Sequence, residues 1–284
     1  MMQFFIDNNV SICTSIDGNR KIQNKNRPYT NKVSYEETVN NIKKLRENGK
    51  NINAIETTTK FSLENYKEIV DEYINLGLKN IFIRPLTKLG KADNNWENIG
   101  YDAQEFLGFY KKVLEYILQK NKERINLVEG HSSILLKKIL RNSPVNYMEL
   151  RSPCGGAIGQ LAYYYDGNIY TCDEGRMLAE MGNDSFRLGN VEKNSYKNLM
   201  ESDSTKAMCV ASCIECLPTC SGCVYTPYCG TCHVINLTQD ENIFAKYPKE
   251  FRCKVYGGIL DILFDYIEKN DKEIMDIFKR WVNQ

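Results

Sequence analysis

Seven of the eleven cysteines in this 284-residue chain lie between Cys209 and Cys232, in the segment CVASCIECLPTCSGCVYTPYCGTC. Thiolates separated by two or three residues on a tight loop can converge on one iron or zinc centre. Disulfides are the alternative, but an odd number of cysteines and an N-terminus without a secretory pattern favour reduced thiols. The segment therefore predicts metal chemistry late in the chain.

The other cysteines extend this pattern in both directions. Cys154 is followed after twelve residues by Gly167, then after four more by Cys172, and Cys253 follows the crowded segment. Within that segment the spacing is Cys220-x2-Cys223-x5-Cys229-x2-Cys232. The Cys-x2-Cys pairs alone suit structural zinc sites equally well, and the half from Cys154 to Cys172 favours iron–sulfur clusters.

The first hundred residues alternate between strand and helix patterns. Strands are predicted at 10–16, 53–59 and 80–84, and helices at 34–48, before Gly49, and between the N-cap candidate Ser62 and Gly77. Such alternation predicts a parallel sheet with helical crossovers, as in α/β barrels, whose ligand sites lie at the C-terminal ends of the strands. Ser15 and Asp17 are at the first of these ends.

The character of the sequence changes further along. A loop at 87–100 precedes helices at 102–120 and 132–140, and 159–172 is typical of a hairpin around an Asp166-Gly167 turn. A short helix at 196–200 and a C-terminal helix at 258–282 are also predicted. We expect three parts: an incomplete α/β barrel at 1–100, a helical connector at 101–145, and a small cysteine-rich α+β domain at 146–284.

The order of the cysteines, with the turn glycine in place, resembles the SPASM domain of radical S-adenosylmethionine (SAM) enzymes that modify ribosomally made peptides and proteins. The stretch TSIDG at 14–18 and the NKNRP that starts at Asn24 look like the fourth barrel strand of those enzymes and the loop after it. The stretches at 81–86, 165–167, 173–180 and 186–190 look most like maturases of the His-Xaa-Ser peptide system. The resemblance covers nearly the whole chain.

The resemblance implies two auxiliary [4Fe–4S] clusters. By position, the first would be held by Cys154, Cys172 and Cys232, and the second by four further cysteines: Cys220, Cys223, Cys229 and Cys253. The family usually has three residues between the last two cysteines of the central group, whereas Cys229 and Cys232 are separated by two. The assignment of Cys232 to the first cluster is therefore open, and a neighbouring cysteine is the alternative ligand.

The resemblance also implies roles for four other residues. Asp173 follows Cys172, and in related sulfatase-maturing enzymes an aspartate there is proposed to take a proton from the substrate; the alternative is a cap on the following turn. Ser15, Asp17 and Arg27 would line or shape the SAM pocket of a complete enzyme. The alternatives are that Asp17 and Gly18 form a simple turn and that Arg27 belongs to a surface ion pair.

The loop that holds the SAM cluster in this family, Cys-x3-Cys-x2-Cys, follows the first barrel strand. By the resemblance this chain starts near the fourth strand, so the place for that loop is missing, and Cys13 stands alone. Cys209, Cys213 and Cys216 have the required spacing but lie in the auxiliary region. One of them is expected to complete the first auxiliary cluster. The chain alone is therefore not expected to cleave SAM, and a second chain that supplies the missing strands is an expected partner.

Charge and hydropathy exclude other classes of protein. Thirty-seven basic and 36 acidic residues give a net charge of +1, so no nucleic-acid partner is expected, and no apolar run is long enough for a membrane helix. We expect a cytoplasmic protein that acts on a peptide or protein substrate. The alternatives are a stand-alone iron–sulfur or zinc module for peptide recognition or electron transfer, and a decayed remnant.

The chain has two histidines, His131 and His233. His233 directly follows Cys232, so it is interpreted either as a metal ligand or as a polar residue in a loop.

Overall fold

The computed structural model describes residues 2–28, 34–244 and 251–283. The chain is a mixed α/β protein with two compact units. The first unit comprises Met1–Thr87, Trp96–Ser133 and Asp261–Gln284, and the second comprises Lys88–Asn95 and Ile134–Leu260. No helix in the described ranges is both long and apolar enough to cross a membrane.

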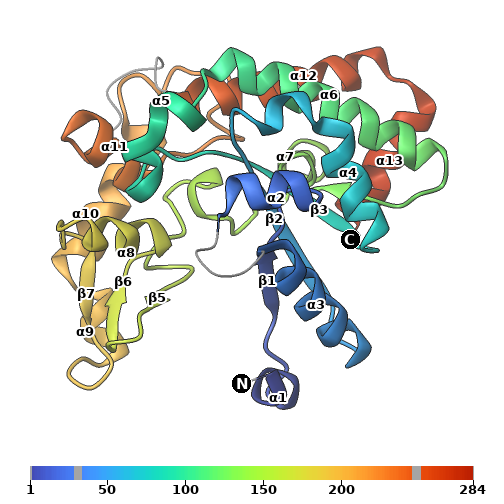
Figure 1. The fold of residues 1–284 in the computed structure, drawn as a ribbon. Helices are drawn as coiled ribbons and strands as arrows, with labels where there is room; N and C mark the ends of the chain where they lie inside the picture. The colour runs from blue at the N-terminus through green and yellow to red at the C-terminus, as the bar shows by residue number, and fades with distance from the viewer. Residues whose placement is uncertain (1, 29–33, 245–250, 284) are drawn as a thin grey trace. The chain divides into compact units, whose positions relative to one another are not determined.

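The first unit is built on a parallel sheet, which confirms the predicted alternation. The strands β1 (Ile12–Ser15), β2 (Ile52–Thr58), β3 (Asn80–Pro85) and β4 (Val128–Glu129) lie side by side in chain order (Figure 1). The strand β4 was not predicted, because two residues are too short to show an alternating pattern. Since all four strands run the same way, their C-terminal ends meet at one edge.

Helices connect the strands of this sheet. They are α2 (Arg20–Asn26), α3 (Ser34–Glu47), α4 (Tyr66–Asn75), α5 (Trp96–Ile99) and α6 (Ala103–Lys122), and α1 (Met2–Asp7) precedes β1. Gly49 and Gly77 have φ angles of 75° and 63°, the left-handed conformation that ends a helix. The sequence therefore placed both helix ends correctly.

The start of α4 differs from the prediction that Ser62 is its N-cap. Ser62 opens a separate 3-10 turn, η1 (Ser62–Glu64), and α4 begins after Asn65. The Ser62 hydroxyl instead accepts hydrogen bonds from the Thr59 backbone N–H (3.1 Å) and the Asn26 side-chain amide (3.2 Å). It is used to close the loop after β2, which local sequence could not show.

The C-terminal segment forms two helices rather than the single one predicted at 258–282. They are α12 (Phe251–Lys269) and α13 (Lys272–Val282). Asn270 has a φ of 49°, and the Asp271 carboxylate accepts a hydrogen bond from the backbone N–H of Ile274 (3.0 Å). A left-handed Asn followed by an Asp cap breaks the helix, and α13 then packs its buried face, including Trp281, against α6.

The second unit contains the predicted hairpin. Strands β5 (Ala162–Tyr163) and β6 (Asn168–Tyr170) pair antiparallel, and β7 (Arg187–Asn190) adds a third strand that was not predicted. Gly167 in the turn has a φ of 82°, which favours glycine, and the Asp166 carboxylate accepts from the Asn168 N–H (2.9 Å). The turn therefore reverses the chain between β5 and β6, and Cys172 follows β6.

The second unit also contains short helices. They are α7 (Gly130–Arg141, which begins in the first unit), α8 (Asp173–Glu180), α9 (Tyr196–Met200), α10 (Asp203–Ser212) and α11 (His233–Asp240), with the turns η2 (Gly90–Asn95), η3 (Met148–Leu150) and η4 (Ile214–Cys216). Of these helices, α8 and α10 contact the small sheet. The stretch at 87–100 is thus not a plain loop, since η2 and α5 lie within it. The cysteine-rich segment begins in α10, and most of it from Cys213 to Cys232 has no regular helix or strand.

Candidate functional site

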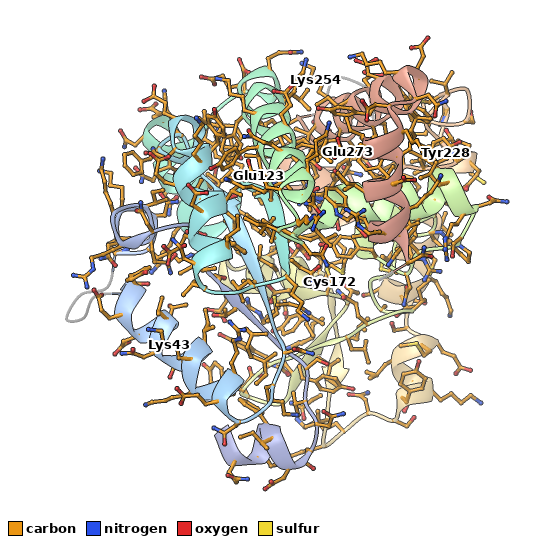
Figure 2. The ribbon with its side chains drawn as sticks, turned by 90° about the vertical axis from the view of Figure 1, so that its right-hand side faces the viewer. Lys43, Glu123, Cys172, Tyr228, Lys254 and Glu273 are labelled. Atoms are coloured by element: carbon orange, nitrogen blue, oxygen red, sulfur yellow. The ribbon has the colours of Figure 1, made fainter. Side chains whose placement is uncertain are left out.

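Three of the predicted ligand thiols lie in the interior of the second unit. Cys154, Cys172 and Cys232 are 2%, 2% and 7% exposed, and Cys172 is labelled in Figure 2. Cys172 is the N-cap of α8, where its sulfur accepts from the Gly175 backbone N–H (3.4 Å), and Cys232 immediately precedes α11. Cys172 and Cys232 also share one core cluster with Phe186.

Burial governs the protonation of these thiols. It raises the pKa of Cys232 to about 12, against the positive charge of Arg252, and negative charge on Glu174 adds to the rise. Burial likewise raises the pKa of Cys172 well above its usual value, with a contribution from Glu174 and then from Cys232. Such thiols ionise when a metal supplies positive charge, because a coordinating thiol is deprotonated outright. The donor set therefore fits a metal cluster.

A second set of cysteines lines a cavity in the same unit. Cys220, Cys223, Cys229 and Cys253 all face it, Cys232 reaches it as well, and its volume is about 70 Å³. That volume is several times the roughly 10–15 Å³ that one water needs. Burial raises the pKa of Cys229 to about 11, and charges on Cys253 and Cys220 add to this. The structure thus brings together all four cysteines that the resemblance assigns to the second cluster.

A half-buried lysine holds the loop beside this cavity. The Lys138 ammonium on α7 donates to the backbone carbonyls of Leu150 (2.6 Å) and Tyr228 (2.7 Å). Burial lowers the pKa of Lys138, while negative charge on Cys229 raises it. Lys138 therefore fixes the chain next to Cys229 and brings a positive charge toward the thiols, a role that no sequence pattern indicated.

A buried ion pair lies near the first thiol set. The Glu149 carboxylate accepts hydrogen bonds from the Arg252 guanidinium (2.5 Å) and the Tyr256 hydroxyl (2.8 Å). Positive charge on Arg252 lowers the pKa of Cys154 and Cys232, against the larger effect of burial. Sequence reasoning missed this group, because Glu149 and Arg252 are far apart in the chain and neither belongs to a motif.

The other three cysteines of the cysteine-rich segment, Cys209, Cys213 and Cys216, are not gathered at one point. Cys213 and Cys216 have their sulfurs 3.7 Å apart, whereas Cys209 packs against a different core cluster around Ala157 and Met208. Across the parts of the chain that the structure describes, no three Cys, His, Asp or Glu side chains are placed to hold a single metal ion. The expectation that one of these cysteines completes the first cluster remains a prediction.

Asp173 is at the surface rather than among the thiols. Its carboxylate side chain is 64% exposed at the first position of α8, and it forms an ion pair with Arg176 at 2.8 Å. A carboxylate at that position also suits the positive end of the helix dipole.

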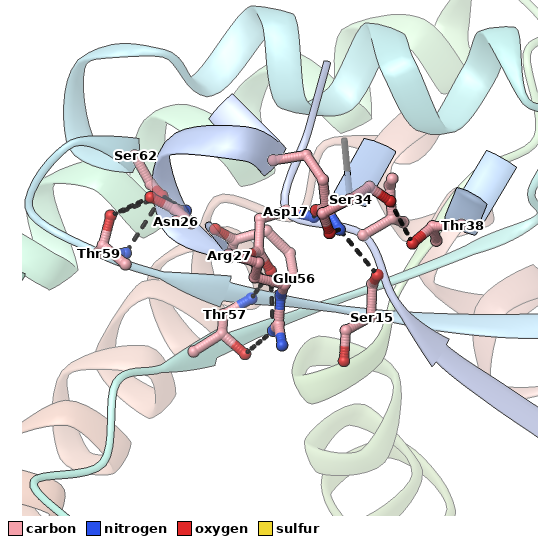
Figure 3. A network of polar contacts seen from close by, with 12 residues as sticks. Ser15, Asp17, Asn26, Arg27, Ser34, Thr38, Glu56, Thr57, Thr59 and Ser62 are labelled. Carbon is pink, nitrogen blue, oxygen red and sulfur yellow. Dashed lines mark hydrogen bonds and ion pairs between the residues drawn. The ribbon is translucent and has the colours of Figure 1, made fainter. Parts of the chain in front are cut away.

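The strand ends of the first unit carry a polar network that includes Asp17 and Arg27 (Figure 3). The Asp17 carboxylate accepts two hydrogen bonds from the Arg27 guanidinium (2.8 and 3.1 Å) and one from the Thr57 backbone N–H (3.1 Å). The Asp17 side chain is 2% exposed and that of Arg27 is 36% exposed, so this is not a surface ion pair. The pair ties the end of β1 to the end of β2.

Ser15 lies beside this network at the end of β1 and is half-buried. Its backbone carbonyl accepts from the side-chain amide of Gln23 at 3.4 Å. Gln23 also accepts from the Asp17 backbone N–H at 2.7 Å, so α2 is fixed to the turn after β1. Ser15, Asp17 and Arg27, the three residues that the resemblance assigns to the SAM pocket, therefore lie close together.

Glu56 is a further buried carboxyl in this network, and sequence reasoning missed it. It is 0% exposed and accepts from the Thr58 hydroxyl (2.7 Å). Burial, and next the negative charge of Asp17, raise its pKa well above the ordinary 4.5. A carboxyl in an apolar strand would be read from the sequence as a surface residue.

Glu56→Gln is expected to reduce the loss of stability that occurs as the pH rises. Above pH 4.5 the Glu56 carboxyl keeps its proton in the folded state, whereas it loses the proton in the unfolded chain. Its contribution to the free energy of unfolding is therefore complete below pH 4.5 and declines as the pH rises toward the higher pKa of the folded state. Both tryptophans, Trp96 and Trp281, are in the first unit. Urea unfolding followed by their fluorescence at pH 5.5 and 8 measures the effect. A wild-type-like pH dependence in the variant would contradict it.

His233 is buried, which contradicts its interpretation as a polar loop residue. It is the first residue of α11, its side chain is 0% exposed, and its ring centroid lies 5.2 Å from that of Phe186. Burial lowers the pKa of His233 to about 4. Neither ring nitrogen has a hydrogen-bond partner among the described residues. By contrast, the other histidine, His131, bonds through Nδ1 to the Ile83 carbonyl at 2.9 Å.

Neither a protein-family model nor a curated protein matches the sequence. Solved structures do match. Native anSMEcpe with bound AdoMet superposes with a TM-score of 0.71 at 17% identity, over 99% of this chain and 70% of that chain. Native anSMEcpe with bound AdoMet and Kp18Cys peptide gives 0.69 at 16% identity, over 94% and 72%. SuiB of Streptococcus suis bound to S-adenosylmethionine gives 0.54 at 17% identity, over 82% and 52%. The chain therefore has the fold that these solved structures share.

Proposed function

We propose that this chain is the part of a radical SAM/SPASM peptide-modifying enzyme that holds two auxiliary [4Fe–4S] clusters. One observation carries the proposal: Cys154, Cys172 and Cys232 are buried in the core, and Cys220, Cys223, Cys229 and Cys253 line a cavity that Cys232 also reaches. The fold supports it, since the similar structures are the radical SAM/SPASM enzyme anSME and SuiB, both with bound SAM.

The clusters would supply redox-active iron near the substrate, and the protein supplies their ligands and surroundings. Arg252 and Lys138 offset negative charge around the thiolates. The Asp17–Arg27 pair would shape the SAM pocket by fixing the loop after β1, with Ser15 at its edge. Asp173, exposed at the start of α8, would take a proton from the substrate.

The fold class proposed is an incomplete α/β barrel followed by a SPASM-type domain. β1 is at one end of the four-stranded sheet, so a second chain could add strands beside it. The substrate would be a ribosomally made peptide, since a similar structure was solved with a bound peptide. The finer resemblance to His-Xaa-Ser maturases points to a peptide of that class.

The test is anaerobic reconstitution with iron and sulfide, followed by addition of SAM and a strong reductant. We expect two reduced-cluster signals by electron paramagnetic resonance (EPR) and no 5′-deoxyadenosine from the chain alone. We also expect SAM to leave both signals unchanged, because neither set of thiols has the Cys-x3-Cys-x2-Cys spacing of a SAM cluster. Formation of 5′-deoxyadenosine that is lost in Cys213→Ala would show that Cys209, Cys213 and Cys216 hold a SAM cluster, and would contradict this assignment.

A further inference from the structure

We propose that His233 is the fourth protein ligand of the cluster held by Cys154, Cys172 and Cys232. This inference rests on the proposed function, because it concerns one of the two clusters assigned above. It goes further by giving the two clusters different ligand sets: three thiolates and an imidazole for the first, and four thiolates for the second.

The first step is a count of ligands. The core contains three of the assigned thiols, whereas a four-iron cluster takes four protein ligands. Five cysteines line the cavity, and the four other than Cys232 make up the second set. Cys209 packs against the Ala157 and Met208 core, and Cys213 contacts Cys216. The backbone N–H of Cys154 donates to the hydroxyl of Ser212, the residue before Cys213, at 3.0 Å. A thiol from that segment is therefore a rival of this inference.

The second step is the environment of His233. Its side chain is fully buried, and neither ring nitrogen has a hydrogen-bond partner within the described residues. Buried polar groups are nearly always hydrogen-bonded, and an exception calls for a ligand, an ion or a water. His233 follows Cys232 directly and contacts Phe186, which packs in the same core cluster as Cys172 and Cys232. The unsatisfied imidazole thus adjoins one thiol in the sequence and contacts a ring of the core cluster that contains two of the thiols.

The third step compares His233 with the buried carboxylates nearby. The Glu149 carboxylate already accepts hydrogen bonds from Arg252 and Tyr256. Glu174 is 4% exposed, and its charge raises the pKa of Cys154, Cys172 and Cys232, so it is the rival ligand. Glu174 also interacts with the positive charge of Arg252. The imidazole fits better, because it is a good iron ligand and has no other interaction that satisfies its nitrogens.

An imidazole ligand changes the redox property of the cluster. Replacing thiolate by neutral histidine raises the reduction potential, as in clusters of the Rieske type. We therefore expect the first cluster to be reduced before the second, whose ligands are all thiolates. His233→Cys should restore four thiolates, keep the iron content of the wild type, and bring the two potentials closer together.

The experiment uses the full chain loaded anaerobically with iron and sulfide and reduced with dithionite. Electron–nuclear double resonance compares protein made with natural and with ¹⁵N-labelled histidine. We expect nitrogen coupling on one of the two cluster signals, altered by the label, absent in His233→Ala and His233→Cys, and retained in His131→Gln and Glu174→Gln.

Two results would overturn the inference. One is a pair of cluster signals in the labelled wild type without histidine coupling, which needs no variant to fold. The other is coupling that persists in His233→Ala or disappears in His131→Gln. Wild-type protein that binds no iron would instead contradict the proposed function, so the two failures are distinguishable.

Discussion

The double variant Cys220→Ala, Cys253→Ala is expected to halve the iron and acid-labile sulfide of the chain, from about eight to about four of each. Both thiols line the same cavity as Cys223 and Cys229, and the two thiolates that remain of the second set cannot hold a cluster there. The first cluster should survive, because Cys154 and Cys172 do not line the cavity and Cys232, which does, is unchanged in the variant. Iron and sulfide analysis after anaerobic reconstitution makes the measurement.

The reciprocal variant Cys154→Ala, Cys172→Ala should lose the other half, with a different EPR signal remaining. The matched control is Cys13→Ala, a cysteine on β1 in the first unit, which should keep all of the iron. If either double variant loses all iron, the thiols form one shared centre rather than two. If both double variants keep all of it, these thiols are not ligands.

Arg27→Met is expected to destabilise the first unit by about 2–3 kcal/mol. Breaking a buried pair by removing one partner costs roughly 3–5 kcal/mol, and water around the partly exposed Arg27 reduces this. The cost arises because the buried Asp17 carboxylate loses the guanidinium that donates two of its hydrogen bonds. Urea unfolding followed by tryptophan fluorescence reports it, since both tryptophans are in this unit.

The double variant Asp17→Asn, Arg27→Met distinguishes a buried charge from lost packing. Neutralising Asp17 should recover most of the stability, because no unpaired charge then remains in the interior. Lys279→Met breaks an exposed pair with Asp276 and should leave unfolding unchanged. Equal stability of Arg27→Met and the double variant would contradict the account.

Much of the fold could be predicted from local patterns. The alternation of strands and helices up to Arg84, the left-handed Gly49 and Gly77, and the Asp166-Gly167 turn depend on neighbouring residues. The predictions failed where contacts between residues far apart in the chain determine the structure. Ser62 bonds back to Asn26 instead of capping α4, and β4 and β7 are too short to carry a pattern.

The candidate site divides in the same way. Cysteine spacing predicted both groups of thiols, because ligands to one centre come in short repeats. The groups around them could not be found, because Arg252 meets Glu149 only through tertiary packing. Lys138 contacts Tyr228 in the same manner. His233 was visible as a neighbour of Cys232, but its burial and its unsatisfied nitrogens depend on packing against Phe186.

The most direct test of the central claim is Mössbauer spectroscopy of the whole chain, purified anaerobically and loaded with ⁵⁷Fe. The account predicts about eight irons per chain, all in [4Fe–4S] clusters of two distinguishable kinds. Mononuclear iron bound by four thiolates, or colourless protein that holds zinc alone, would contradict it.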